Sequence, residues 1–286
     1  MSNQTADTFE QGFMSRSLEE QIEQCDQYEL APLFLELFKD RSPVLEAGCG
    51  SGRWCAWLHK HSIQSDGIDW SQTLCERASK EIPTSKFVAC DVRNTPFDDK
   101  SYGGILALGT VEHIIEGPVS ALSEFNRLLK DDGAALITVP YGGSLRILIR
   151  TLNKPLRFFK SIPLVRRIFG LKSGSSSLAS AIKTARPEWH PRFSHGDEGW
   201  FFFEYEFNKK QMRTFLDEAG FKVDKEIVCF RDAGIFHTFG RISGKWNTAK
   251  GGVDFSPLGR ILKAIVPAES VGHMVCHVVS KKKAES

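Results

Sequence analysis

The chain has 286 residues, of which 25% are charged and 41% hydrophobic, and these ordinary values argue against general disorder. Its formal net charge of +2 gives no overall reason to expect nucleic-acid binding. The seven cysteines are scattered and include no C-x-x-C pair. Residues 1–16 lack the apolar core of a signal peptide. No apolar stretch approaches the ~20 residues that a membrane-spanning helix needs. We therefore expect reduced thiols in a cytoplasmic protein that is soluble or peripheral to the inner face of the membrane.

Apolar residues recur at helical spacing between positions 17 and 39, so residues 1–40 are expected to form an N-terminal helical segment. Strands are then expected at 43–47, 63–69, 86–91, 103–109 and 134–139, and helices at 53–61, 71–80 and 118–130. Such alternation predicts βαβ units and a parallel sheet.

The alternation stops after Pro140, and residues 141–207 are expected to form an insert that is rich in basic and aromatic residues. Residues 208–286 resume the pattern with a helix at 208–219, strands at 221–230 and 272–280, and an irregular stretch at 231–270. The whole predicts an α/β fold with a doubly wound, mostly parallel seven-stranded sheet and an insert after its fifth strand.

The stretch 46–52 joins the first strand to the helix that follows. Gly48, Gly50 and Gly52 leave one side of this turn without a Cβ, so a ligand can approach the main-chain amides. The spacing does not match the dinucleotide pattern G-x-G-x-x-G. Glu46, just before the first glycine, would repel a pyrophosphate and suits a ligand with an ammonium group.

Two further acids follow the next two strands. Asp69 lies 21 residues after Gly48, where a carboxylate can accept hydrogen bonds from both ribose hydroxyls. Asp91 follows the third strand, where it could accept from an adenine amino group. For each acid alone, a solvated carboxylate at a strand end is the alternative.

Together with residues 109–114 (GTVEHI) and 122–133 (LSEFNRLLKDDG), these features resemble the class I S-adenosylmethionine-dependent methyltransferases, in the subgroup of quinone and small-metabolite enzymes. The likeness is close over residues 43–140 and looser over 208–223. Asp131 and Asp132 stand where the family has Pro-Gly. The resemblance implies a Rossmann-like methyltransferase fold, S-adenosylmethionine (SAM) as cofactor, and residues 41–140 as the SAM-binding core.

The resemblance also implies which residues border the cofactor. The methionyl end would lie near Glu46, Gly48, Gly50 and Gly52, the ribose near Asp69, the adenine near Asp91 and Val92, and the floor would be formed by Leu108 and Gly109. Trp70 would lie against the adenine face, with core packing as the alternative.

Glu112 and His113 follow the fourth strand, on the side from which an acceptor would approach. His113 is the best-placed general base for a hydroxyl acceptor, and the alternative is that it positions the following helix. Some quinone O-methyltransferases of the group have a further acid three residues before the glutamate and bind a divalent metal. That position is Gly109 here, so no metal is predicted.

Residues 133–187 contain ten lysines and arginines, interleaved with bulky apolar residues, and no acid. This pattern predicts that residues 144–172 lie on an anionic membrane surface, with a lid packed on the sheet as the alternative. A nucleic-acid face is the least favoured interpretation. Further along, His190, His195 and Tyr205 are candidate substrate contacts, and the aromatic run 200–207 is either an apolar acceptor wall or a buried strand face.

The sequence therefore predicts methyl transfer from SAM to a hydroxyl, less readily an amine, of a small acceptor that can be lipid-linked, quinone-like or a glycan precursor. One alternative is a non-catalytic SAM-binding accessory protein, which would not need the intact glycine loop and acids. Another is an RNA or protein methyltransferase, although the Asn-Pro-Pro-Tyr-type signature of amino-nitrogen acceptors is missing after the fourth strand.

Overall fold

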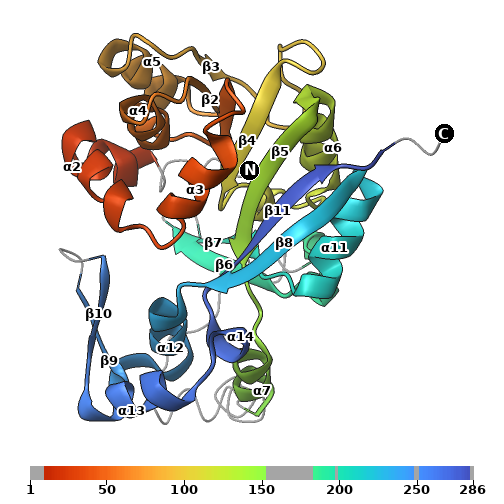
Figure 1. The fold of residues 1–286 in the computed structure, drawn as a ribbon. Coiled ribbons are helices and arrows are strands. Elements are labelled where there is room, and N and C mark those ends of the chain that lie inside the picture. The colour runs from red at the N-terminus through yellow and green to blue at the C-terminus, as the bar shows by residue number, and fades with distance from the viewer. Residues whose placement is uncertain (1–9, 153–182, 197–198, 248–250, 284–286) are drawn as a thin grey trace.

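The structure is a computed structural model that describes residues 10–152, 183–196, 199–247 and 251–283. Its centre is a seven-stranded sheet with the order β3-β2-β1-β4-β5-β11-β8 (Figure 1). The strands are β1 (Val44–Ala47), β2 (Ser65–Asp69), β3 (Phe87–Ala89), β4 (Tyr102–Leu108), β5 (Leu129–Pro140), β8 (Phe221–Cys229) and β11 (Met274–Lys281). Only β11 runs antiparallel to its neighbours in this sheet. The predicted doubly wound, mostly parallel seven-stranded sheet is confirmed.

Helices cover both faces of the sheet (Figure 1). On one side lie α2 (Leu18–Glu23), α3 (Ala31–Phe38) and α4 (Arg53–Lys60), and on the other lie α6 (Val119–Leu128) and α11 (Lys209–Glu218), while α5 (Gln72–Glu81) follows β2. Neighbouring strand residues enter opposite layers, because side chains alternate along a strand. Val44 packs with the α3–α4 layer, whereas Leu45 packs with the α6–α11 layer.

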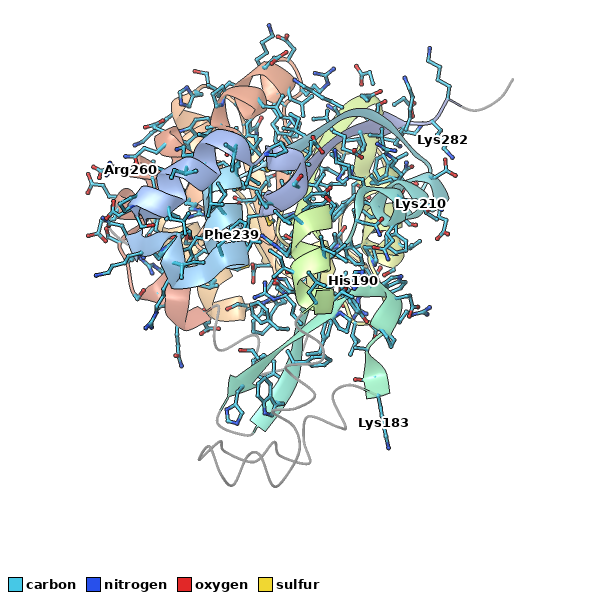
Figure 2. The ribbon with its side chains drawn as sticks, turned by 90° about the horizontal axis from the view of Figure 1, so that it is seen from below. Lys183, His190, Lys210, Phe239, Arg260 and Lys282 are labelled. Atoms are coloured by element: carbon cyan, nitrogen blue, oxygen red, sulfur yellow. The ribbon has the colours of Figure 1, made fainter. Side chains whose placement is uncertain are left out.

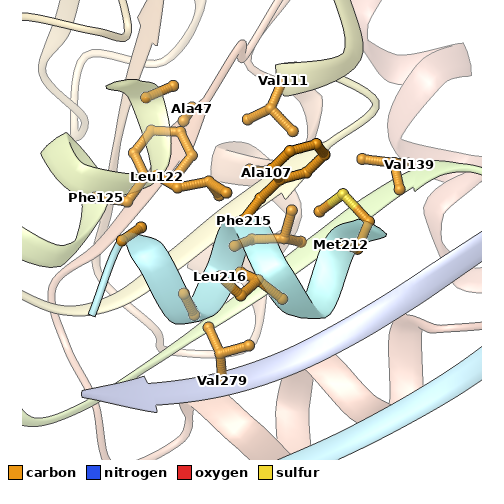
Figure 3. Close-up of a cluster of buried hydrophobic side chains, with 14 of the residues drawn as sticks. Ala47, Ala107, Val111, Leu122, Phe125, Val139, Met212, Phe215, Leu216 and Val279 are labelled. Atoms are coloured by element: carbon orange, nitrogen blue, oxygen red, sulfur yellow. The ribbon is translucent and has the colours of Figure 1, made fainter. Parts of the chain in front are cut away.

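The α6–α11 layer is the larger core, and Figure 3 shows its centre. Met212, Phe215 and Leu216 of α11 recur at helical spacing and point toward Leu122 and Phe125 of α6. Burying each of these side chains contributes about 1.5–3 kcal/mol. This layer holds β4 and β5 in place, and so fixes the loops at their carboxyl ends.

The strand order reverses between β1 and β4, the two strands at the centre of the parallel part. At such a point the loops at the carboxyl ends diverge and leave a crevice, which is where open α/β sheets bind ligands. The glycine loop after β1 and residues 109–114 after β4 border that crevice.

The fifth strand begins earlier than the sequence predicts. Leu129 already pairs with Tyr102, while Ala134 pairs with Gly104, so residues 130–133 form a bulge against a single residue of β4. The two aspartates at 131 and 132 lie in this bulge, between the predicted helix 118–130 and the predicted strand 134–139.

Residues 231–270, expected to be irregular, form short regular elements. These are α12 (Arg231–Phe239), the 3-10 turn η4 (Gly240–Ile242), β9 (Gly244–Asn247), β10 (Gly252–Phe255), α13 (Pro257–Ile265) and α14 (Ala268–Val271). The glycines and prolines separate elements instead of preventing them. Gly251 adopts φ 58° in the β9–β10 turn, and Pro257 occupies the first turn of α13, where a proline is well tolerated.

The insert contributes α7 (Ser144–Leu152) and a hairpin of β6 (Pro191–Gly196) and β7 (Gly199–Tyr205). The predicted membrane-surface segment 144–172 lies outside the described residues beyond position 152. The aromatic run was predicted to bury Phe201, Phe203 and Tyr205 on one strand face. Phe201 and Tyr205 are 8% and 0% exposed, but Phe203 is only half-buried, because β7 shifts its register against β6 between Phe202 and Glu204. Within the described ranges, no helix is long and apolar enough to cross a membrane.

Candidate functional site: a cofactor cavity beside a buried acid–histidine cluster

A cavity of about 410 Å³ lies at the carboxyl ends of β1 to β4. This volume is within the roughly 300–1,000 Å³ range of small-molecule and cofactor sites. The lining residues come from the loops after these strands, from α5 and from the N-terminal segment: Phe13, Gly48, Asp69, Trp70, Leu74, Ala89, Cys90, Asp91, Val92, Arg93, Leu108, Gly109, Thr110, His113 and Ile114. The wall is mostly apolar, with polar groups concentrated at Asp69, Asp91 and His113.

The glycine loop reaches the cavity through Gly48, whereas the predicted cofactor contacts Gly50 and Gly52 do not line it. Gly48 and Gly50 have φ values of 78° and 53°, which L side chains rarely adopt. A Cβ on Gly48 would lie 2.6 Å from Thr110 Oγ1, and one on Gly50 would lie 2.8 Å from the Phe13 ring. The side of the glycine loop that was expected to face a ligand therefore also contacts the Thr110 and Phe13 side chains.

Glu46 does not line the cavity. Its carboxyl Oε2 accepts hydrogen bonds from the backbone amide (3.1 Å) and the thiol (3.2 Å) of Cys55, in the first turn of α4. Burial raises the pKa of Glu46 to about 8. The structure therefore places Glu46 beneath the glycine loop, where it joins β1 to α4 and does not contact the cavity directly.

Asp69 lines the cavity and is 6% exposed. Its Oδ2 accepts from the amide of Gly50 and its Oδ1 from the amide of Ser71, both at 2.9 Å. Burial raises its pKa, while these backbone hydrogen bonds act in the opposite direction. Each carboxylate oxygen has a second lone pair, so Asp69 can still accept from a ligand while it holds the glycine loop.

Trp70 is 42% exposed and lines the cavity, so it is not part of the core, which was the alternative interpretation. Val92 and Leu108 add apolar surface. Asp91 is held by Arg93, with an Nη2–Oδ2 distance of 2.6 Å, and hydrogen bonding to this guanidinium lowers its pKa. An adenine amino group would share Asp91 with Arg93, a contact that no local sequence pattern indicates.

The N-terminal segment takes part in the site, and sequence reasoning missed this. Phe13 lines the cavity and packs against Gly50, and Glu10 Oε2 accepts a 2.8 Å hydrogen bond from Ser71 Oγ. Ser71 is also the N-cap of α5. These contacts join residues far apart in sequence, so no local pattern indicated them.

Glu112 and His113 form the 3-10 turn η2 (Val111–His113) and are 1% and 6% exposed. His113 Nδ1 lies 2.6 Å from the carbonyl oxygen of Phe203 on β7, and the two rings meet edge to face at 5.3 Å. Burial lowers the pKa of His113 to about 4, with hydrogen bonds to backbone carbonyls acting in the opposite direction. The ring is therefore neutral near pH 7. The hairpin of the insert thus covers the turn after β4 and completes this end of the site.

Glu204 of β7 joins this pair, and sequence reasoning missed it. One ligating atom each of Glu112, His113 and Glu204 lies within 4.8 Å of the other two. Burial and the neighbouring Glu204 raise the pKa of Glu112, and burial raises the pKa of Glu204 to about 7. The alternation in β7 that buries Tyr205 in the core directs Glu204 to the other face, which is the signal that could have found it.

The candidate substrate contacts lie elsewhere. Tyr205 is fully buried; its hydroxyl donates to the Ile115 carbonyl (2.8 Å) and accepts from the Arg186 amide (3.0 Å), so this placement does not support an acceptor role. His190 and His195 are exposed and do not line the cavity. Figure 2, the view from below, shows His190 at the base of the hairpin.

A larger cavity of about 1320 Å³ lies between the N-terminal helices and the 231–271 segment. Tyr28, Arg53, Phe230, Trp246 and Lys263 are among its lining residues. It shares no lining residue with the smaller cavity.

Comparison with known proteins agrees with this geometry. Residues 45–137 match the family described as "Methyltransferase domain". The chain is 30% identical over 109 residues to "Probable tRNA methyltransferase 9B" of Mus musculus, covering 37% of this chain and 23% of that protein. It is 29% identical over 107 residues to demethylmenaquinone methyltransferase of Chlorobaculum tepidum, covering 37% and 44%. The chain thus spans less than half the length of these relatives.

A solved SAM-dependent methyltransferase from Archaeoglobus fulgidus has the same fold, with a TM-score of 0.54, 16% identity, and coverage of 97% of this chain and 99% of that one. The residues that line the cavity fit S-adenosylmethionine. Asp69 offers hydrogen-bond acceptors suited to ribose hydroxyls, and Trp70, Val92 and Leu108 provide apolar surface. Residues 45–137 therefore form a methyltransferase domain within the fold of S-adenosylmethionine-dependent methyltransferases, and S-adenosylmethionine is the cofactor that fits the cavity.

Proposed function

We propose that the protein transfers a methyl group to a hydroxyl of a small acceptor that is lipid-linked, quinone-like or a glycan precursor. The observation that carries the proposal is the polar end of the cofactor cavity. His113 is the member of the buried Glu112–His113–Glu204 cluster that lines the cavity, beside Leu108 and Gly109. A hydroxyl acceptor must lose its proton, and these are the ionisable groups closest to where it would approach.

Bound SAM supplies an electrophilic methyl group on a sulfonium. The chain's own contribution is positioning and exclusion of water. His113, held by the Phe203 carbonyl, presents a neutral ring to the cavity, and the hairpin above it keeps solvent from the cluster. The acceptor hydroxyl would lose its proton beside this ring as its oxygen attacks the methyl carbon.

An apolar face with basic residues supports a lipid-associated acceptor. Leu258, Ile261 and Ile265 of α13 are 47%, 57% and 69% exposed and lie on one helical face. Leu148 and Leu152 of α7 are 52% and 69% exposed. Both helices lie at the lower end of Figure 1 and face the viewer in Figure 2, where Arg260 is labelled. Apolar side chains flanked by cations suit an anionic lipid surface, so we propose that this end contacts the cytoplasmic membrane face.

RNA methylation is the competing function, because one of the compared relatives is by name a tRNA methyltransferase. That likeness covers 109 residues, which are 37% of this chain and 23% of the relative. The near-neutral net charge gives little support for a polyanionic acceptor.

The test is incubation with methyl-labelled SAM and, separately, lipid extract, small soluble metabolites and total RNA. We expect label in the lipid fraction, on an oxygen identified by mass spectrometry. His113→Ala should lower turnover by about 10²–10⁴ while leaving S-adenosylhomocysteine affinity nearly unchanged. His61→Ala, at the exposed end of α4, is the matched control. Label in RNA, or full turnover by His113→Ala, would contradict the proposal.

A further inference from the structure

The larger cavity, of about 1320 Å³, lies between the N-terminal helices and the segment 231–271 (Figure 1). Its volume exceeds the roughly 300–1,000 Å³ of ordinary small-molecule sites, so it can hold a second molecule beside the cofactor. We propose that this cavity binds the methyl acceptor, and that the acceptor carries a phosphate or carboxylate group next to a planar, apolar part. The inference rests on the proposed O-methylation and adds the chemical class of the acceptor.

The two cavities approach each other at Gly109 and Met274. Gly109 lines the cofactor cavity, and Met274, the first residue of β11, lines the larger one. A Cβ on Gly109 would lie 3.9 Å from Met274 Cε, which is an ordinary contact distance. Methionine is unbranched and flexible. A ligand in the larger cavity can therefore reach the cofactor cavity by displacing this one side chain.

Two half-buried arginines of the cavity wall have no acidic partner. Arg53 begins α4 and Arg231 begins α12, and neither side chain makes an ion pair or a hydrogen bond with another described residue. The guanidinium of Arg53 lies over the Trp54 ring, 5.7 Å from its centroid. A guanidinium presents its donors in a fork that matches the oxygens of phosphate and carboxylate. Both arginines are therefore suited to bind an anionic group in this cavity.

The acids of the same wall do not neutralise these arginines. Asp232 forms an ion pair with Lys263 at 2.6 Å. Glu29 accepts a 2.8 Å hydrogen bond from the backbone amide of residue 230. The other two acids on the wall belong to α2 and are exposed to solvent. The positive charge of the two arginines is thus left for a ligand.

Aromatic rings form a further part of the wall. The Tyr28 ring packs against those of Trp54 and Phe230, with centroid distances of 5.0 and 4.9 Å, and Trp246 is 43% exposed although it lines the cavity. Phe230 has a φ of 55°, which bulky residues rarely adopt and which is more frequent at ligand sites than elsewhere. Such rings bind planar or apolar groups. The wall therefore suits a ligand with both an anionic and an apolar part.

Two buried ring nitrogens of wall residues, Trp54 Nε1 and His273 Nδ1, have no hydrogen-bond partner among the described residues. An indole N–H can only donate, and a buried donor without an acceptor is costly. Burial lowers the pKa of His273 to about 3, so this ring is neutral and one of its nitrogens also donates. The wall thus has more donors than acceptors, as an acceptor-rich ligand such as a phosphate ester requires.

Helix α13 connects this cavity with the proposed membrane face. Lys263 lines the cavity, whereas the exposed side chains of Leu258, Ile261 and Ile265 lie on the opposite side of the same helix. A lipid-linked acceptor would therefore place its anionic head group in the cavity while its apolar tail stays at the membrane surface.

The test uses the full-length chain and naphthyl phosphate, whose binding is measured by calorimetry with S-adenosylhomocysteine present. We expect one molecule per chain, bound about tenfold or more tightly than uncharged naphthol. Arg231→Gln should weaken naphthyl phosphate binding about tenfold or more and leave S-adenosylhomocysteine affinity unchanged. Arg260→Gln is the matched control, because Arg260 of α13 is exposed and lines neither cavity. It should bind both ligands normally.

The same assay distinguishes a lipid head group from a soluble phosphate. Displacement of naphthyl phosphate by vesicles that contain phosphatidic acid, and not by pure phosphatidylcholine vesicles, indicates a lipid-linked acceptor. Displacement by inorganic phosphate alone indicates a soluble one, and both results support the anion site.

Three results would overturn the proposal: no binding of naphthyl phosphate by the wild type at millimolar concentration, equal affinity for naphthol, or full affinity in Arg231→Gln. The two proposals fail separately. If Arg231→Gln forms O-methyl product with an unchanged KM for the acceptor, the larger cavity is rejected as the acceptor site and the O-methylation stands. If naphthyl phosphate binding depends on Arg231 but no O-methyl product forms, the O-methylation is rejected and the anion site stands.

Discussion

The most informative single substitution is Asp69→Asn, which keeps the size of the side chain and removes its charge. In the folded protein Asp69 accepts from two amides, those of Gly50 and Ser71, at 2.9 Å. The asparagine oxygen can keep only one of these bonds, and its NH₂ group would face the other amide. Hydrogen bonds to a charged group contribute about 1.5–3 kcal/mol each, so the glycine loop should be less stable by that amount.

The same substitution should weaken cofactor binding, because a ribose hydroxyl loses its charged acceptor. A loss of about 1.5–3 kcal/mol corresponds to roughly ten- to a hundredfold weaker S-adenosylhomocysteine binding in calorimetry at 25 °C. Asp66→Asn is the matched control on the same strand. Asp66 accepts from the Lys86 amide (2.9 Å) and the Tyr102 hydroxyl (3.2 Å) but does not line the cavity.

We therefore expect both variants to lose stability in urea denaturation and only Asp69→Asn to lose affinity. Unchanged affinity in Asp69→Asn would remove this residue from the ribose contact. An equal loss of affinity in Asp66→Asn would also refute a direct ribose contact, because a general destabilisation of β2 would then explain the weaker binding.

Three further predictions address the loop, the N-terminal segment and the apolar face. Since the pKa of Glu46 is raised from 4.5 to about 8, the wild type should lose stability as pH rises through that window. As pH rises from 5.5 to 8.5, the free energy of unfolding of Glu46→Gln, measured in urea, should increase by about 3 kcal/mol relative to that of the wild type. A difference between the two proteins that does not change with pH would refute the raised pKa of Glu46. Phe13→Ala should weaken S-adenosylhomocysteine binding about tenfold because an apolar contact is lost. Met14 is 46% exposed, so Met14→Ala should leave this affinity unchanged. If the two variants bind S-adenosylhomocysteine equally well, Phe13 does not contact the ligand. The wild type should co-sediment with anionic vesicles in a salt-sensitive manner, and Ile261→Ser with Ile265→Ser should weaken this even at low salt; no wild-type binding would exclude the membrane face.

Much of the fold could be predicted from the sequence, because its parallel core is built from elements with clear periodicity. The strands and helices between residues 43 and 140 lie close to their predicted positions. The exception is the early start of β5, since a bulge is set by its pairing with β4 and not by composition. The elements in 231–270 are only four to nine residues long, apart from one 3-10 turn, too short for a periodic pattern to stand out among glycines and prolines.

The candidate site was less accessible to sequence reasoning wherever contacts join distant segments. Asp69, Trp70 and Val92 follow parallel strands, so their order along the chain already places them at one edge of the sheet. Phe13 and Glu204 reach the site through tertiary packing of the N-terminal segment and the hairpin. Tyr205 was predicted as a substrate contact because of its hydroxyl. Adjacent side chains of a strand point to opposite faces, so Glu204 faces Glu112 and His113 while Tyr205 is buried in the core.

The central claim is that the methyl donor binds in the cavity bordered by Asp69, Trp70 and Val92. Hydrogen exchange with and without S-adenosylhomocysteine tests it most directly, with NAD as the comparison ligand. We expect protection of residues 48–52, 69–74 and 89–93 by S-adenosylhomocysteine and none by NAD. Protection confined to the walls of the larger cavity, around Tyr28 and Phe230, or protection by NAD at the glycine loop, would contradict it.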